Sequence, residues 1–362
     1  MEHFENQEIY KSLTVSKDVS APPTLNPYLD QMRKKRIKRS ASDYVEGILK
    51  GDIAMLGQAV TLVESTLPQH YQIAQEIIEK CLPYTSHSVR IGITGVPGAG
   101  KSTSIDTLGM YLINKGHKLA VLAIDPSSER THGSILGDKT RMSLLSREKH
   151  AFIRPSPSAG SLGGVARRTR ETIVLCEAAG FDMIIVETVG VGQSETVVHS
   201  MVDFFLLIQL AGTGDELQGI KRGIMEMADG IAINKAEGDN LPKAKLAAAN
   251  YRNALSLFPP GESGWTPKVI TYSGYYALGV EELWNMVDEY VTFVKANGYF
   301  ERKRDEQAKY RMYESINNLL RSSFYNDPEI EKLLPVMEKK VLNKKASAFV
   351  TARKLIDLFL KR

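Results

Sequence analysis

Eight consecutive residues have the composition of a loop that binds phosphate. They read Gly95-Val96-Pro97-Gly98-Ala99-Gly100-Lys101-Ser102 and match the pattern G-x-x-x-x-G-K-[ST] in full. Glycines let a backbone wrap closely around a phosphate with its N–H groups pointing inward. Lys101 would neutralise phosphate oxygens, and Ser102 would offer its hydroxyl to Mg²⁺. An apolar run at 89–94 precedes the loop and a helix-compatible stretch at 102–116 follows it, so the context predicts a nucleoside triphosphate site.

Two carboxylates stand where a metal-bound triphosphate needs them. Asp125 ends the apolar run at 118–125, and Glu187 ends the run at 181–187. Carboxylate oxygens suit Mg²⁺, which keeps several waters and accepts one or two such ligands. Taken alone, Asp125 reads as a turn residue and Glu187 as a solvated strand end. Together in a chain with a phosphate loop, they favour a metal site formed with Ser102.

Asn234 and Lys235 close another apolar run and resemble a base-reading motif. The guanine reader is usually N-K-x-D, whose aspartate accepts hydrogen bonds from the guanine N1–H and N2 amine. Here that position holds Glu237, which is one methylene longer, and Asp239 lies two residues too late. A turn at a strand end is the alternative interpretation of Asn234-Lys235. The motif's order in the chain favours base reading, with a longer carboxylate than usual.

The loop after Glu187 departs from the usual arrangement for hydrolysis. Its Glu-x-x-Gly pattern resembles a switch in which the N–H of Gly190 meets the γ-phosphate. Many small GTPases place a water-positioning glutamine directly after that glycine, but this chain has Val191 there and Gln193 two residues later. We expect slow intrinsic hydrolysis that a partner improves.

Short apolar runs separated by helix-compatible stretches indicate how these residues are positioned. Such alternation is typical of a mostly parallel β-sheet covered by helices on both faces. The fold class predicted is therefore α/β, a P-loop NTPase with N-terminal and C-terminal helical extensions. The six runs expected to form strands are 89–94, 118–125, 181–187, 203–210, 230–234 and 268–272.

Composition places the chain among ordinary globular proteins. It has 362 residues, with 46 Lys and Arg against 42 Asp and Glu, a net charge of +4. Two cysteines are too few for a disulfide framework, and no apolar stretch approaches a membrane span, so we expect a cytoplasmic protein without membrane contact. One dense basic run at 33–39 lacks interleaved aromatic residues, so nucleic-acid binding is not predicted. The expected segments are a flexible polar and basic lead at 1–40, a helical extension at 41–88, the P-loop domain at 89–285 and a helical dimerisation segment at 286–362.

Several longer blocks resemble the MeaB/ArgK family of P-loop GTPases. They follow the family's order over some 140 residues and are far more specific than a phosphate loop alone. The blocks are Gly95 to Thr103, IDPSS at 124–128, ILGDKTRM at 135–142, FIRPSPSAGSLGGVARRTRET at 152–172, ETVGVGQSE at 187–195 and GTGDELQGIKRGIMEMAD at 212–229.

The resemblance implies a GTPase chaperone of adenosylcobalamin-dependent methylmalonyl-CoA mutase or a related cobalamin mutase. It also implies GTP or GDP and Mg²⁺ as ligands, and a homodimer formed through C-terminal helices. Asp138 and Arg141 match the first switch, Glu187 the second, and Gln218 with Lys221 a third mobile segment. The residues that the resemblance assigns to catalysis are Lys101, Asp138, Arg141, Gln218 and Lys221. Those that it assigns to the nucleotide are Gly95 to Thr103, Asn234, Lys235, Glu237, Ser273, Gly274 and Tyr275.

Two other functions remain open on the sequence alone. One is a nucleotide-dependent kinase linked to basic amino-acid transport, an older label of the same family. The chain shows no separate acceptor-binding motif for it. The other is a GTP-gated interaction module with negligible turnover. Phosphate release from GTP, measured with and without a mutase, distinguishes all three.

Overall fold

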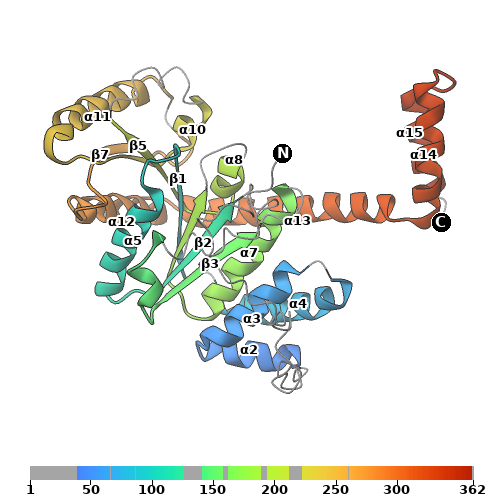
Figure 1. Cartoon of the computed structure of the whole chain (residues 1–362), viewed down its shortest axis with the longest axis horizontal. Helices are drawn as coiled ribbons and strands as arrows, with labels where there is room; N and C mark the ends of the chain where they lie inside the picture. The colour runs from blue at the N-terminus through green and yellow to red at the C-terminus, as the bar shows by residue number, and fades with distance from the viewer. Residues whose placement is uncertain are drawn as a thin grey trace, which may run out of the picture. The chain divides into compact units, whose positions relative to one another are not determined.

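The computed structural model describes residues 39–65, 67–85, 87–125, 141–157, 162–188, 194–211, 222–259 and 261–360 (Figure 1). Residues 1–38 of the expected polar lead at 1–40, with most of the basic run at 33–39, lie outside these residues. The compact unit described below spans Ala41–Arg362.

The described strands form one seven-stranded sheet in which every pair is parallel (Figure 1). Its order is β3-β2-β4-β1-β5-β6-β7, so β1 lies at the centre between β4 and β5. The predicted α/β class is confirmed, and six of the strands fall on the six apolar runs. The strand bounds are β1 Val89–Gly95, β2 Leu119–Asp125, β3 Ala151–Pro157, β4 Met183–Thr188, β5 Phe204–Leu210, β6 Gly230–Asn234 and β7 Lys268–Thr271.

The edge strand β3 is the one that the apolar runs did not indicate. It pairs with β2 in parallel, with Leu119 opposite Ala151. Its sequence AFIRPSP carries Arg154 and two prolines, so no continuous apolar run is visible. Proline cannot donate a ladder hydrogen bond, and a strand with a neighbour on only one side tolerates that loss. Its edge position therefore explains why the apolar pattern does not extend to this strand.

Helices cover both faces of the sheet (Figure 1). Because neighbouring strand residues point to opposite faces, Ile184 packs with the N-terminal helices and α7, whereas Ile185 packs with α5 and α12. The helices in the first of these layers are α2 Ala41–Leu49, α3 Ile53–Glu64, α4 Pro68–Cys81, α7 Leu162–Ala178 and α8 Ser194–His199. The helices in the second are α5 Lys101–Asn114 and α12 Val280–Ala296. Beside β5, β6 and β7 lie α10 Arg222–Met227 and α11 Leu241–Leu255, with the short turns η3 Leu82–Tyr84, η4 Leu145–Arg147 and η5 Gly238–Asn240 elsewhere on the chain.

The N-terminal helices share the core of the sheet domain. Asp52 caps α3 by accepting hydrogen bonds from the backbone N–H groups of Ala54 and Met55. Leu56 of α3 and Ile77 of α4 are fully buried in the same apolar cluster as strand residues of β2 and β4. The described residues of the 41–88 segment are therefore joined to the sheet by a continuous core.

Helix α12 and the start of α13 (Tyr299–Tyr325) are also fixed to the sheet. The expected segment boundary at residues 285 and 286 falls inside α12, where Leu283 and Val287 are both buried. In α13, Arg304 forms a two-pronged ion pair with Asp203 at 2.9 and 2.7 Å, and Lys303 Nζ donates to the Asp203 carbonyl at 2.8 Å. Because Asp203 directly precedes β5, these bonds tie α13 to the amino-terminal end of the sheet.

Beyond its anchored start, α13 continues into a separate helical pack. Helices α14 (Pro328–Leu342) and α15 (Ala348–Leu360) pack on each other, and the rings of Phe324 and Phe359 meet edge to face at 5.5 Å. A groove of about 460 Å³ in this pack is lined mainly by apolar residues, among them Leu320, Leu355 and Ile356. Across the described residues, no helix combines the length and the apolarity needed to span a bilayer.

Candidate nucleotide-binding site

A cavity of about 610 Å³ lies at the carboxyl ends of the central strands. Its size is within the range of small-molecule sites. Parallel sheets bind ligands at this end because the loops that follow the strands converge there. The residues that line it are Pro97, Gly98, Gly100, Lys101, Ser102, Thr103, Ala123, Ile124, Arg141, Glu187, Thr188 and Lys235.

Two glycines of the phosphate loop are required by close contacts. Gly95 has φ 155°, and a Cβ there would lie 2.2 Å from the Ile208 carbonyl oxygen of β5. Gly100 has φ 87°, and its Cβ would lie 2.6 Å from Nδ2 of Asn234. Side chains at either position would push the loop off its neighbouring strands. Helix α5 begins directly afterwards at Lys101, so its N-terminal N–H groups face the cavity end of the loop.

Lys101 is buried at the base of this loop. Its Nζ donates to the carbonyl oxygens of Gly95 at 2.9 Å and Val96 at 3.3 Å. Burial lowers the pKa of its amine, and the carboxylates of Glu187 and Glu195 oppose that shift. The ammonium group is thus held in place within the cavity wall, next to the loop that would surround a phosphate.

Ser102 and Glu187, two of the predicted metal ligands, lie next to each other. The Ser102 hydroxyl donates to Oε1 of Glu187 at 3.1 Å, and Glu187 is 8% exposed at the end of β4. A hydroxyl and a carboxylate on one wall of a phosphate cavity are the oxygen donors that Mg²⁺ accepts, so these residues fit that ion. Asp125 is the last residue of β2, one step past Ile124, whose register partner on β4 is Thr188. The side chain of Asp125 is not among those that the structure describes.

Asn234 holds the far side of the cavity together. Its Nδ2 donates to the Ala99 carbonyl at 2.8 Å, which links β6 to the phosphate loop. Its Oδ1 accepts from the backbone N–H groups of Lys235 at 2.8 Å and Gly274 at 2.9 Å. One buried amide therefore fixes three loops relative to one another, so the predicted Asn234 lies at the site, in a linking position.

Glu237 carries a buried oxygen without a hydrogen-bond partner among the described residues. That atom is Oε2, and the residue itself is only partly exposed. Lys235 has a left-handed backbone with φ 59°, and Gly238 has φ 51°. The chain therefore turns on both sides of Glu237. A buried acceptor that lacks a donor is the group that a guanine edge would satisfy.

The segment Ser273 to Tyr275 follows β7 and reaches the same region. Ser273 is buried, whereas Tyr275 is 77% exposed and meets Tyr276 edge to face at 4.9 Å. Sequence reasoning missed how this segment is supported. Thr107 of α5 donates to the Gly274 carbonyl at 2.6 Å, and the hydroxyls of Ser104 and Tyr272 are 2.5 Å apart. No pattern in the sequence indicates these contacts, because Thr107 is one of several polar residues in α5.

The remaining predicted residues divide into two groups. Arg141 lines the cavity. Asp138, Gln218 and Lys221 lie outside the described residues, as do Gly190, Val191 and Gln193. Within the part of the chain that the structure covers, no group of three or more His, Cys, Asp or Glu side chains is placed to hold a metal.

Comparisons with known proteins agree with this geometry. Residues 56–329 match the family described as "Methylmalonyl Co-A mutase-associated GTPase MeaB". A "Putative GTPase" of Caulobacter vibrioides is 49% identical over 312 residues, which cover 86% of this chain and 95% of the relative. The "Methylmalonic aciduria type A homolog, mitochondrial" of Mus musculus is 42% identical over 348 residues, which cover 93% of this chain and 83% of the relative.

A solved structure shares the fold. The "Crystal structure of LAO/AO transport system kinase" superposes with a TM-score of 0.70 at 36% identity and covers 88% of this chain and 97% of its own. The phosphate loop, the strand-end carboxylate and the tied base-side loops thus occur together in a chain with GTPase relatives. The chain belongs to the MeaB family of P-loop GTPases.

Proposed function

We propose that this GTPase assists cofactor loading and protection of an adenosylcobalamin-dependent methylmalonyl-CoA mutase in the cytoplasm. The observation that carries the proposal is the family match over residues 56–329, whose description names association with that mutase. The two described cysteines are buried free thiols, in keeping with a reducing compartment.

The site residues have complementary roles in hydrolysis. Lys101 and the N–H groups of the phosphate loop bind the β- and γ-phosphates, and Glu237 with Asn234 orients the guanine side. Ser102, Glu187 and Asp125 would hold Mg²⁺, which when bound neutralises phosphate oxygens. Arg141 adds a positive charge to the same cavity. Asp138, Gln218 and Lys221 belong to switch segments that complete the site.

The loop after Glu187 suggests that a partner stimulates GTP hydrolysis, because it lacks a glutamine at the usual water-positioning place. Val191 stands where many small GTPases place a water-positioning glutamine, so an apolar side chain occupies that position here. A partner that moves the switch segments would supply the missing arrangement. The kinase alternative, suggested by the name of the solved relative, requires phosphate transfer to an acceptor instead of to water.

The metal site gives the first prediction. Glu187→Gln keeps the side-chain size but removes the charge beside Ser102, so kcat for GTP hydrolysis should fall at least roughly 100-fold. Asp125→Ala should also lower kcat. Asp239 is an exposed acidic residue near the base side, and Asp239→Asn should leave kcat almost unchanged. Phosphate release is measured across a Mg²⁺ titration. Wild-type turnover by folded Glu187→Gln at every Mg²⁺ concentration would remove this residue from the site.

Base selectivity gives the second prediction. The unpartnered Oε2 of Glu237 should pair with guanine, so GTP and GDP should bind more tightly than ATP. Glu237→Ala should reduce that preference by about 1–3 kcal/mol, or roughly ten- to a hundredfold, and Glu237→Asp should widen it. Calorimetric titration of each nucleotide measures the preference. Equal binding of ATP and GTP, or an unchanged preference in Glu237→Ala, contradicts the assignment.

The partner gives the third prediction. A cobalamin mutase from the same organism should raise the GTP turnover rate at least about tenfold, which is small beside the roughly 10³–10⁵ of an arginine finger. Gln218→Ala or Lys221→Ala should blunt the increase while leaving nucleotide binding intact. The exposed Lys243→Ala on α11 serves as the control. A rate that no such mutase changes counts against the chaperone function, and phosphate transfer to a basic amino acid favours the kinase.

The fourth prediction concerns self-association. We propose a homodimer because the groove beside α13, α14 and α15 leaves Leu320 60% and Ile356 48% exposed. Light scattering at micromolar concentration should give twice the mass of one chain. Ile356→Asp should weaken association at least tenfold because a carboxylate would be buried at an apolar contact, whereas Leu246→Asp, an exposed leucine on α11, should not. A monomeric wild type is the contradicting result.

A further inference from the structure

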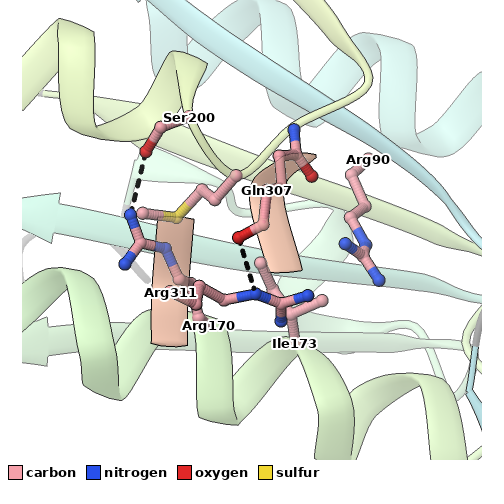
Figure 2. A pocket seen from close by; sticks show the side chains of 7 residues that line it. Arg90, Arg170, Ile173, Ser200, Gln307 and Arg311 are labelled. Carbon is pink, nitrogen blue, oxygen red and sulfur yellow. Dashed lines mark hydrogen bonds between the residues drawn. The ribbon is translucent and has the colours of Figure 1, made fainter. Parts of the chain in front are cut away.

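Two small cavities lie between α7 and α13, near the amino-terminal end of the sheet. Figure 2 shows the inner one. The inner cavity is about 10 Å³ and the outer about 140 Å³, and Arg170 and Arg311 line both. Arg90, the second residue of β1, lines the inner one. Gly95 of the phosphate loop is five positions further along β1, roughly 17 Å of strand. The cavities are therefore distinct from the nucleotide site.

The charges around these cavities do not balance. Arg90 is paired with Glu177 at 2.8 Å, and Arg170 is paired with Glu314. Arg311 has no carboxylate within ion-pair distance among the described residues, and its Nε donates to a backbone carbonyl of its own helix at 3.2 Å. Burial, together with Arg90 and Arg170, lowers the pKa of Arg311. Glu177 opposes this shift from a distance, but Arg311 forms no ion pair in the described part of the chain.

Two buried polar atoms beside the inner cavity also lack hydrogen-bond partners among the described residues. Nε of Arg170 and Oε1 of Gln307 are buried and have no partner among the described residues, although the two side chains are only 6% and 7% exposed. Such atoms normally find a protein or water partner. The inner cavity has space for about one water molecule, which can accept from Arg170 and donate to Gln307. The outer cavity then remains for a larger group.

We propose that Arg170 and Arg311 bind a phosphate group in the outer cavity, as a second anion site separate from the nucleotide. Guanidinium groups match the oxygens of phosphate in both charge and geometry. Oε2 of Glu171, a buried oxygen in the same wall, also lacks a hydrogen-bond partner among the described residues. A singly protonated phosphate supplies both the negative charge that Arg311 lacks and a hydroxyl that can donate to Glu171.

The proposed site also contacts the turn that follows α8. Arg170 donates to the hydroxyl of Ser200 at 2.9 Å, and Ser200 directly follows α8 (Figure 2). Gln307, from the neighbouring wall, donates to the Val202 carbonyl at 2.9 Å. A phosphate held by Arg170 and Arg311 would thus bridge α7, the turn after α8 and α13.

The test uses the full chain saturated with GDP and Mg²⁺, so that the phosphate loop is already filled. Inorganic phosphate is titrated against sodium chloride of equal ionic strength, and the melting temperature is measured. Wild type should show a saturable rise. Arg311→Gln should melt higher than wild type without phosphate, because an uncompensated charge is removed, and should bind phosphate at least about tenfold more weakly. Lys309→Gln makes the same charge change on the exposed face of α13 and should respond like wild type.

Two further arms complete the experiment. Arg311→Lys keeps the charge but loses the planar fork, and it should bind phosphate more weakly while remaining folded. Repeating the titration with glycerol 3-phosphate distinguishes a phosphate monoester from the free ion by which of the two binds more tightly. The proposal is overturned if wild type gains no more from phosphate than from chloride, or if Arg311→Gln and Lys309→Gln respond alike.

Discussion

The nucleotide site depends on the amide of Asn234. This side chain lies at the end of β6, yet it bonds the phosphate loop, 135 residues earlier in the chain, and the loop after β7. An amide can do this because it donates and accepts at once, and burial makes any unmade bond costly. The same amide restricts position 100 to glycine, because a Cβ there would collide with Nδ2 of Asn234. The catalytic side and the base side of the cavity are therefore set by one residue.

The parallel sheet gives its two ends different tasks. At the carboxyl end, the phosphate loop, Glu187 at the end of β4 and Lys235 after β6 converge on the cavity. At the amino end, Asp203 accepts from the backbone N–H of Arg90 at 2.8 Å and from Arg304 of α13, which fixes the long helix to the sheet. Both partners of that ion pair are largely removed from solvent, so loss of either would leave a buried charge unpaired. The start of α13 is thus bonded directly to the sheet that holds the nucleotide site.

Much of this arrangement follows from sequence patterns, for physical reasons. Apolar runs locate six strands because both faces of a parallel sheet are buried, and a phosphate loop between strand and helix locates the site. The pattern failed at β3, where Arg154 and two prolines are tolerated at an edge. It also missed Thr107 and Tyr272, since a polar residue that supports a loop from a distant helix leaves no periodic trace. The described geometry brings Lys101, Ser102, Glu187 and Arg141 to one cavity, whereas the roles of Asp138, Gln218 and Lys221 still rest on resemblance alone.

The pairing of charges around Arg90, Arg170 and Arg311 follows from the fold and not from neighbours in the sequence. Arg170 and Arg311 are 141 positions apart in the sequence. Each lies in a helix that carries a carboxylate close to it along the chain. In the fold, Glu314 pairs with Arg170 of the other helix and not with Arg311, and Glu171 lies 3.6 Å from Arg167. An unmatched guanidinium costs stability when it is partly buried. Arg311 forms no ion pair within the described residues, and this missing partner is the observation on which the proposed anion site rests.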